Sequence, residues 1–162
     1  MSDTNRISDV TLDETGLPVP TPEIAQERKV AIFDLLEENS FAPLAKEGQE
    51  IPPGPYHLSL AVRDKRLVMS IAPEAGGDPA ELHLSLSPFR QVIKDYFAIC
   101  ASYFDAVKNL PPSKIEAIDM ARRGIHNEGS RILMERLEGK VELDHDTARR
   151  LFTLICVLHF KG

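Results

Sequence analysis

The spacing of apolar residues changes at residue 87, and this change constrains the fold more than any other feature. Between residues 56 and 86, apolar residues alternate with polar ones, as in the segment HLSL, which occurs at 57–60 and again at 83–86. Such alternation is typical of strands with one buried face. From residue 87 onward, apolar residues recur every three or four positions, as on an amphipathic helix. Strands followed by helices predict an α+β fold.

We expect an antiparallel sheet of three or four strands, with one N-terminal helix and three C-terminal helices packed on it. Residues 1–21 are expected to be an N-terminal segment, partly extended or mobile, and residues 22–162 a single α+β domain. The expected elements are a strand at 7–12, a helix from 22 to about 39, a loop at 41–55, strands around a tight turn at 63–66, and helices at 87–110, 113–139 and 144–160.

Local signals fix several of these boundaries. Thr21 before Pro22 is a favourable helix start, because threonine caps a helix and proline fits its first position. Ser113, with Glu116 three residues later, has the spacing of a capping box. Asp144 or Asp146 is expected to cap the last helix.

Composition excludes several classes of protein. The net charge of −6 argues against nucleic acid and acidic membrane surfaces as partners, since both require a basic footprint. The longest apolar run, 151–158, is far shorter than the roughly 20 residues that span a bilayer. The N-terminus is polar and acidic, unlike a signal peptide, and Cys100 and Cys156 lack a paired spacing. We therefore expect a cytoplasmic protein with free thiols.

The segment ARRGIHNEGS, residues 121–130, raises the sharpest question about function. Gly124 and Gly129 each cost roughly 1 kcal/mol relative to alanine inside a helix. Either the helix continues and something offsets this cost, or it breaks here. On a continuous helix, Gly129 lies within the apolar stripe, where its missing side chain lets a neighbouring segment approach closely, and Gly124 lies off the stripe.

On that helix the polar side chains gather on one edge. Arg122, Arg123, His126 and Ser130 lie there, and they are able to hold a carboxylate or phosphate by charge-assisted hydrogen bonds. Asn127 completes the candidate ligand-binding set, and His126 and Glu128 are the candidate catalytic residues. These two point about 160° apart on a continuous helix, so only a break would bring them together. The alternative is structural: Arg122 and Glu128 tie neighbouring helices together, and Asp119 pairs with Arg123.

The positions of the other polar residues indicate ordinary structural roles. His57 and His83 occupy a solvated strand face without a visible third ligand, so no metal site is predicted. His145 lies near an expected helix start and His159 near the chain end, positions typical of capping and core-edge residues. Arg149 and Arg150 are misplaced against the helix dipole, which hints at a partner. No phosphate-binding glycine loop or nucleophile motif is present, and no cofactor is predicted.

Several longer segments carry a family resemblance. They are AIFDLLEENSF (31–41), GPYHLSL (54–60), LSPFRQVIKDYFAIC (86–100), PSKIEAIDMARRGIHNEGS (112–130) and DTARRLFTLICVLHF (146–160). Through them the chain resembles uncharacterised protein family 0262, a set of small bacterial proteins. The resemblance covers nearly everything after residue 22, but not the first 20 residues or the loop at 74–80. It implies a soluble bacterial protein and assigns no activity, so no catalytic residue follows from it.

Two functions are compatible with these observations. The last helix is apolar nearly all round in its second half, LFTLICVLHF, which is typical of a core helix or of half a subunit interface. Together with the absence of a catalytic motif, this favours a cytoplasmic, homo-oligomeric binding or regulatory protein. The alternative is a small enzyme or anion-binding protein that acts on a phosphorylated or carboxylated metabolite through the Arg122–Ser130 helix edge.

Overall fold

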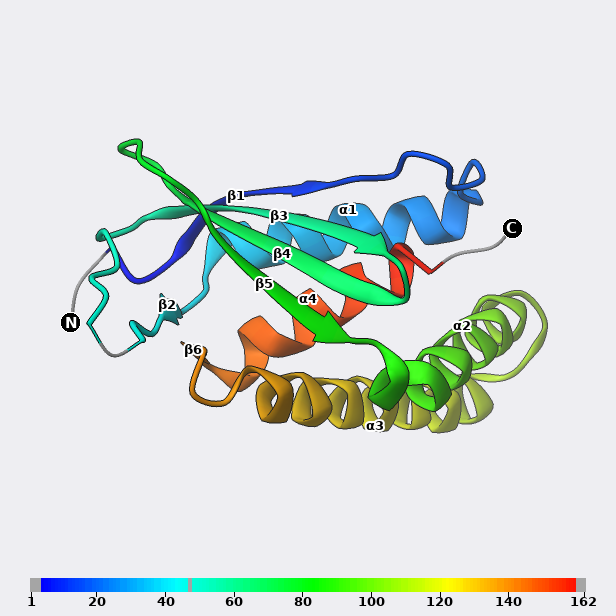
Figure 1. Ribbon diagram of the computed structural model, residues 1–162. Coiled ribbons are helices and arrows are strands. Elements are labelled where there is room, and N and C mark those ends of the chain that lie inside the picture. Colours follow the sequence, from blue (N-terminus) through cyan, green and yellow to red (C-terminus); the bar gives the residue numbers. More distant parts are fainter. Residues whose placement is uncertain (1–3, 47, 160–162) are drawn as a thin grey trace.

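A four-stranded sheet and four α-helices form the fold of the computed structural model, which describes residues 4–46 and 48–159 (Figure 1). The strand order is β1-β3-β4-β5. These strands are β1 (Ile7–Leu12), β3 (Tyr56–Arg63), β4 (Arg66–Pro73) and β5 (Ala80–Ser85). The helices are α1 (Pro22–Glu37), α2 (Arg90–Asn109), α3 (Pro112–Leu137) and α4 (His145–Val157), and a short 3₁₀ turn, Ser87–Phe89, precedes α2. The predicted α+β class is confirmed.

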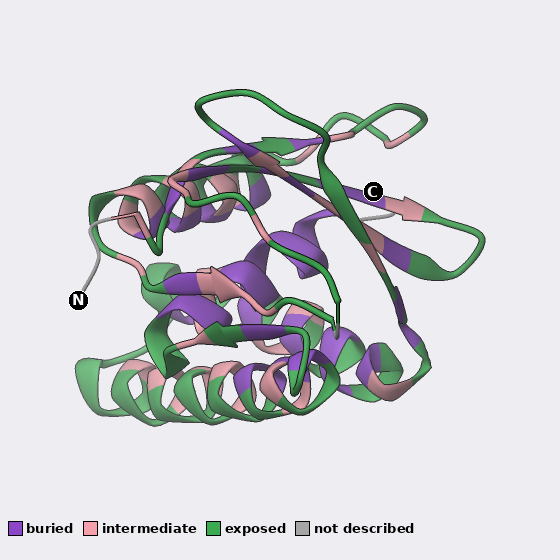
Figure 2. Cartoon of the chain, turned by 60° about the vertical axis from the view of Figure 1, so that its left-hand side comes forward, coloured by how far each residue is buried: buried purple, intermediate pink, exposed green. Residues whose placement is uncertain are grey.

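One face of the sheet is buried. Leu58 and Leu60 on β3 lie opposite Ile71 and Met69 on β4, and all four side chains are almost fully inaccessible. The alternate positions of these two strands are mostly more exposed (Figure 2). The alternation in the sequence therefore identified the buried face correctly.

Strand β1 departs from the predicted antiparallel arrangement. It pairs in parallel with β3, with Val10 opposite Leu58, so the sheet is mixed. Parallel neighbours require a long crossover connection, and α1 lies within the segment that joins β1 to β3. The antiparallel prediction holds for β3, β4 and β5.

Two local predictions were wrong. The segment 41–55, expected to be loop throughout, begins with β2 (Phe41–Pro43), which pairs antiparallel with β6 (Val141–Leu143). The capping box at Ser113 is absent, because Pro111 occupies the N-cap position of α3 without a side-chain hydrogen bond, and Pro112 begins the helix. Proline suits this first position, since it lacks the N–H that would be left unpaired there.

Other boundaries agree with the sequence. Thr21 Oγ1 accepts a hydrogen bond from the backbone N–H of Ile24, and Asp144 Oδ1 accepts one from Thr147. Asp64 and Lys65 form the two-residue turn between β3 and β4, and both have positive φ angles, 51° and 62°. The helix end predicted at Phe160 lies outside the described residues.

Helix α4 is the central helix of the core. Its residues from Leu151 to Val157 are all buried, and it contacts both α1 and α3. The apolar surface that predicted a core helix or a subunit interface is thus covered within one chain. Cys100 and Cys156 are free and buried, as predicted. Among the described residues, no helix is both long and apolar enough to cross a membrane.

Candidate functional site

Helix α3 runs without a break through both glycines of the 121–130 segment. A Cβ atom on Gly129 would lie 2.5 Å from three ring carbons of Phe152, a fully buried residue of α4. Glycine at 129 therefore allows the Phe152 ring to pack against the α3 backbone. A Cβ on Gly124 would meet nothing within 4 Å. Packing explains the first glycine but not the second.

The side chains predicted to bind a ligand along the helix edge do not gather at one site. Arg122, Arg123 and His126 line a small cavity of about 220 Å³ between α1, α3 and α4, which we call the helix-edge cavity. Asn127 faces a different hollow, beside β2 and β6. Ser130 is buried and donates a hydrogen bond to the carbonyl oxygen of His145 at 3.1 Å. The candidate ligand-binding set is thus divided among three environments.

The candidate catalytic pair does not meet either. Glu128 forms an ion pair with Arg131 at 2.5 Å on the exposed side of α3, and this contact lowers the pKa of Glu128. His126 instead packs against the rings of Tyr96 and Phe152, at centroid distances of 5.5 and 6.4 Å. The unbroken helix holds the two side chains apart, as its geometry predicts.

Both arginines of the helix edge already have carboxylate partners. Arg122 Nη2 donates to Glu27 Oε1 at 2.5 Å, and its guanidinium lies 5.0 Å from the centroid of the Tyr103 ring. Arg123 pairs with Asp119 at 3.1 Å, as the i, i+4 spacing predicted. Arg122 therefore ties α3 to α1, which is the structural role foreseen for it, whereas Glu128 forms its ion pair with Arg131 of its own helix.

His126 is held in its neutral form. Burial, together with the positive charges of Arg122 and Arg149, lowers its pKa to about 4, although the negative charge of Asp119 acts in the opposite direction. Its buried Nε2 atom makes no hydrogen bond to the described residues. A group with this pKa is a weak base at neutral pH, so the low pKa does not favour His126 as a general base.

The two arginines at the start of α4 also have partners within the chain. Arg150 Nη1 donates to the carbonyl oxygen of Glu38, next to the last residue of α1, at 3.1 Å. Arg149 lies 3.6 Å from Asp146. A helix end leaves carbonyl groups without partners, and Arg150 satisfies one of them. This contact gives Arg150 a structural role, although the dipole of α4 disfavours a cation near the start of that helix.

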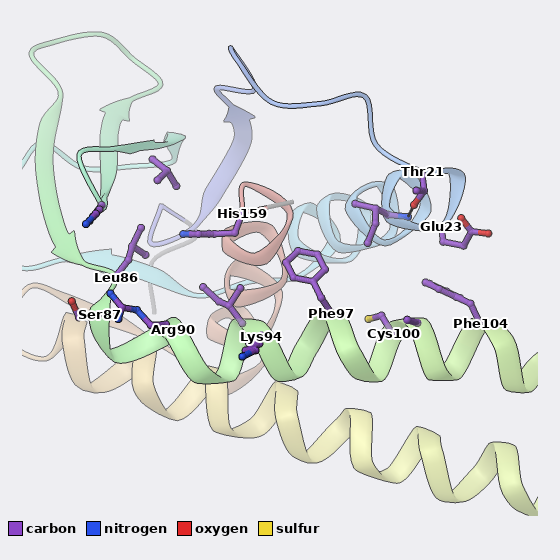
Figure 3. A pocket seen from close by; sticks show the side chains of 15 residues that line it. Thr21, Glu23, Leu86, Ser87, Arg90, Lys94, Phe97, Cys100, Phe104 and His159 are labelled. Atoms are coloured by element: carbon purple, nitrogen blue, oxygen red, sulfur yellow. Dashed lines mark hydrogen bonds between the residues drawn. The ribbon is translucent and has the colours of Figure 1, made fainter. Parts of the chain in front are cut away.

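A third cavity, comparable in size to the hollow of about 1020 Å³ beside β2 and β6, was not foreseen from the sequence. It measures about 900 Å³ and lies between the start of α1, the length of α2, the β3–β4 turn and the end of α4 (Figure 3). Much of its lining is apolar, namely Ile24, Val62, Leu86, Ile93, Phe97, Ala101 and Phe104. We call this space the large cavity.

Three cationic side chains also line the large cavity: Lys65 from the β3–β4 turn, and Arg90 and Lys94 from α2. None of the three forms an ion pair with the described residues. Arg90 and Lys94 are four residues apart and therefore lie on one face of the helix. The cavity combines apolar walls with a few polar groups, as small-molecule sites commonly do.

The sequence held a partial signal for this cavity. Phe97 and Phe104 belong to the aromatic stripe of α2, which helical spacing alone assigns to the core, yet both remain partly exposed. Their exposure depends on how α2 packs against α1 and the sheet, which the sequence pattern does not specify. The described residues contain no group of three metal-binding side chains, and His57 and His83 lie on different strands.

Comparison with known proteins identifies close relatives but no activity. The chain is 71% identical to a protein of Roseobacter denitrificans and 70% identical to one of Ruegeria sp. strain TM1040, each over 98% of this chain and 99% of the relative. A protein of Paracoccus denitrificans is 68% identical over 95% of both chains. No solved structure matches.

The family model that matches this chain covers residues 4–161. It therefore also includes residues 4–20 and the 74–80 loop, which the resemblance drawn from the sequence left out. All three relatives are likewise UPF0262 proteins. The chain belongs to the bacterial uncharacterised protein family UPF0262.

Proposed function

We propose that this protein is a small-molecule-binding protein whose ligand occupies the large cavity. The observation that carries the proposal is the cavity itself, with a volume of about 900 Å³ and a mainly apolar lining. Cavities of roughly 300–1,000 Å³ with apolar walls and a few polar groups are typical of ligand sites.

The alternative of an anion-binding or catalytic site at the helix edge has weaker support. Arg122 and Arg123 already pair with Glu27 and Asp119, so an anion would have to displace a carboxylate from each. The helix-edge cavity is also much smaller than the large cavity, about 220 Å³. We retain it as the second candidate, since Arg149 and His126 line the same space.

The hypothesis of a homo-oligomer, drawn from the sequence, loses its main support. It rested on the apolar surface of α4, and that surface packs against α1 and α3 of the same chain.

Filling the cavity tests the proposal. Ala101 lines the cavity from α2, and Ala98, three residues earlier on the same helix, is exposed and does not. We expect the neutral dye Nile red to bind saturably to the parent protein, and Ala101→Trp to weaken binding by about tenfold or more, equivalent to about 1.4 kcal/mol. Ala98→Trp, the matched control, should leave the affinity unchanged. Absence of saturable binding, or equal effects of the two variants, would refute the proposal.

A further inference from the structure

The charged groups of the large cavity are not spread evenly around it. Figure 3 shows Leu86, Ser87 and Arg90 at one end, and Thr21 and Glu23 at the other. Lys65 belongs to the first end, because its carbonyl oxygen accepts a hydrogen bond from the backbone N–H of Leu86 at 3.3 Å. The cavity is thus cationic at the end that lies beside the sheet.

The positive charge at this end is uncompensated within the described part of the chain. Arg90, Lys94 and Lys65 have no carboxylate within ion-pair distance there. The acidic residue that lines the cavity, Glu23, lies at the opposite end.

Lys65 holds its position at a conformational cost. It has a φ angle of 62°, in the left-handed region that glycine or asparagine occupies more easily. A lysine here fits the turn less well than glycine would, yet it places a cationic side chain in the lining of the cavity. This placement is consistent with a lysine kept for binding rather than for the turn.

The middle and far parts of the cavity are apolar. Phe97 points into the space, and Phe104 lies toward the Glu23 end (Figure 3). Ile24 and Ile93 add buried aliphatic surface. Cys100 adds no charge, because burial raises the pKa of its thiol to about 11. An apolar chain or ring system placed here would leave water and gain contact with aromatic side chains.

We infer that the ligand of the large cavity is an anionic amphiphile, with its head group at Lys65, Arg90 and Lys94 and its apolar part along Phe97 and Phe104. This inference rests on the proposed function and adds the chemical class of the ligand. A carboxylate and a phosphate ester share the required head-group chemistry, since both accept charge-assisted hydrogen bonds from lysine and arginine. Glu23 opposes the reverse orientation by repelling an anionic head.

Three probes with the same apolar chain test this inference. Decanoate, decyl phosphate and 1-decanol are titrated below micelle-forming concentrations against the protein loaded with Nile red, and displacement of the dye gives each affinity. We expect at least one of the two anions to bind about tenfold or more tightly than the alcohol. The tighter of the two anions identifies the preferred head group, and either preference supports the inference.

Two variants separate the head-group contact from the cavity. Arg90→Gln combined with Lys94→Gln should reduce the affinity for the preferred anion toward that of 1-decanol and leave 1-decanol unchanged. Lys108→Gln, an exposed cation of α2 outside the cavity, is the matched control and should change neither. Thermal melts of every variant verify folding.

The outcomes distinguish the two proposals. If the anions and the alcohol bind equally and Ala101→Trp weakens all of them, the cavity binds ligands and the anionic class is wrong. If no probe displaces Nile red, and the dye itself does not bind saturably, the proposed function fails. If the double variant weakens anion and alcohol alike, the cations do not contact the head group, and the inference is overturned.

Discussion

Substituting Gly129 by alanine tests whether close packing of α3 on α4 explains the costly glycine. The added Cβ would lie 2.5 Å from three ring carbons of Phe152, well inside van der Waals contact. The Phe152 ring is fully buried and also packs edge-on against Tyr96, at a centroid distance of 6.2 Å. It therefore has little room to move without shifting other core side chains.

Two opposing effects set the magnitude. Alanine is more favourable than glycine inside a helix by about 1 kcal/mol. Overpacking a tight core costs typically about 1–3 kcal/mol and more where a buried ring must shift. We therefore expect Gly129→Ala to destabilise the protein by about 1–2 kcal/mol. Gly124→Ala has open space around the new Cβ, so it should stabilise by about 0.5–1 kcal/mol.

Urea unfolding followed by circular dichroism measures both variants against the parent. The midpoint should fall for Gly129→Ala and rise for Gly124→Ala, with unchanged slopes. Combining Gly129→Ala with Phe152→Leu should give a smaller loss than the sum of the single losses, because the smaller side chain relieves the clash. The reasoning is refuted if both alanine variants stabilise the protein equally.

Two further predictions follow from His126 and Lys65. Because the pKa of His126 is about 4 in the folded protein and near 6.5 when unfolded, the unfolded state binds more protons between these values. The stability contributed by neutral His126 is thus complete above pH 6.5 and is lost as the pH falls toward 4. The free energy of unfolding of His126→Gln should therefore fall less steeply than that of the parent across this range. Parallel curves of unfolding free energy against pH for the two proteins would contradict the assignment. Lys65→Gly should stabilise the β3–β4 turn by about 1 kcal/mol and weaken anion binding. Asp64→Gly is the matched control, because it relieves a neighbouring positive φ without changing the cavity lining; it should stabilise the turn and leave anion binding unchanged. Equal losses of anion binding in Lys65→Gly and Asp64→Gly would count against a role for the Lys65 side chain.

Local patterns in the sequence predicted much of the secondary structure for physical reasons. Thr21 and Asp144 cap their helices because the side-chain oxygen reaches a free N–H within one turn. Gly129 was placed on the apolar stripe by helical geometry alone, and its contact with Phe152 follows from that position. These features depend on residues that are close in sequence.

Features that depend on distant residues were not predictable in the same way. The parallel pairing of β1 with β3 depends on the path of α1 between them. Glu27, which pairs with Arg122, lies 95 residues away and gives no local signal. The large cavity collects residues from the start of α1, the strands and their turn, α2 and the end of α4, so its existence depends on packing rather than on pattern.

The most direct test of ligand binding in the large cavity is an NMR titration of the isotope-labelled protein with decanoate and with decyl phosphate. Our account predicts saturable shifts of the backbone amides at Lys65, Lys94, Phe97 and Ala101, which lie around the cavity. Shifts confined to the helix edge around Arg122 and His126 would contradict this location and favour the second candidate site. No saturable shift with either anion, together with no saturable binding of Nile red, would contradict the account as a whole.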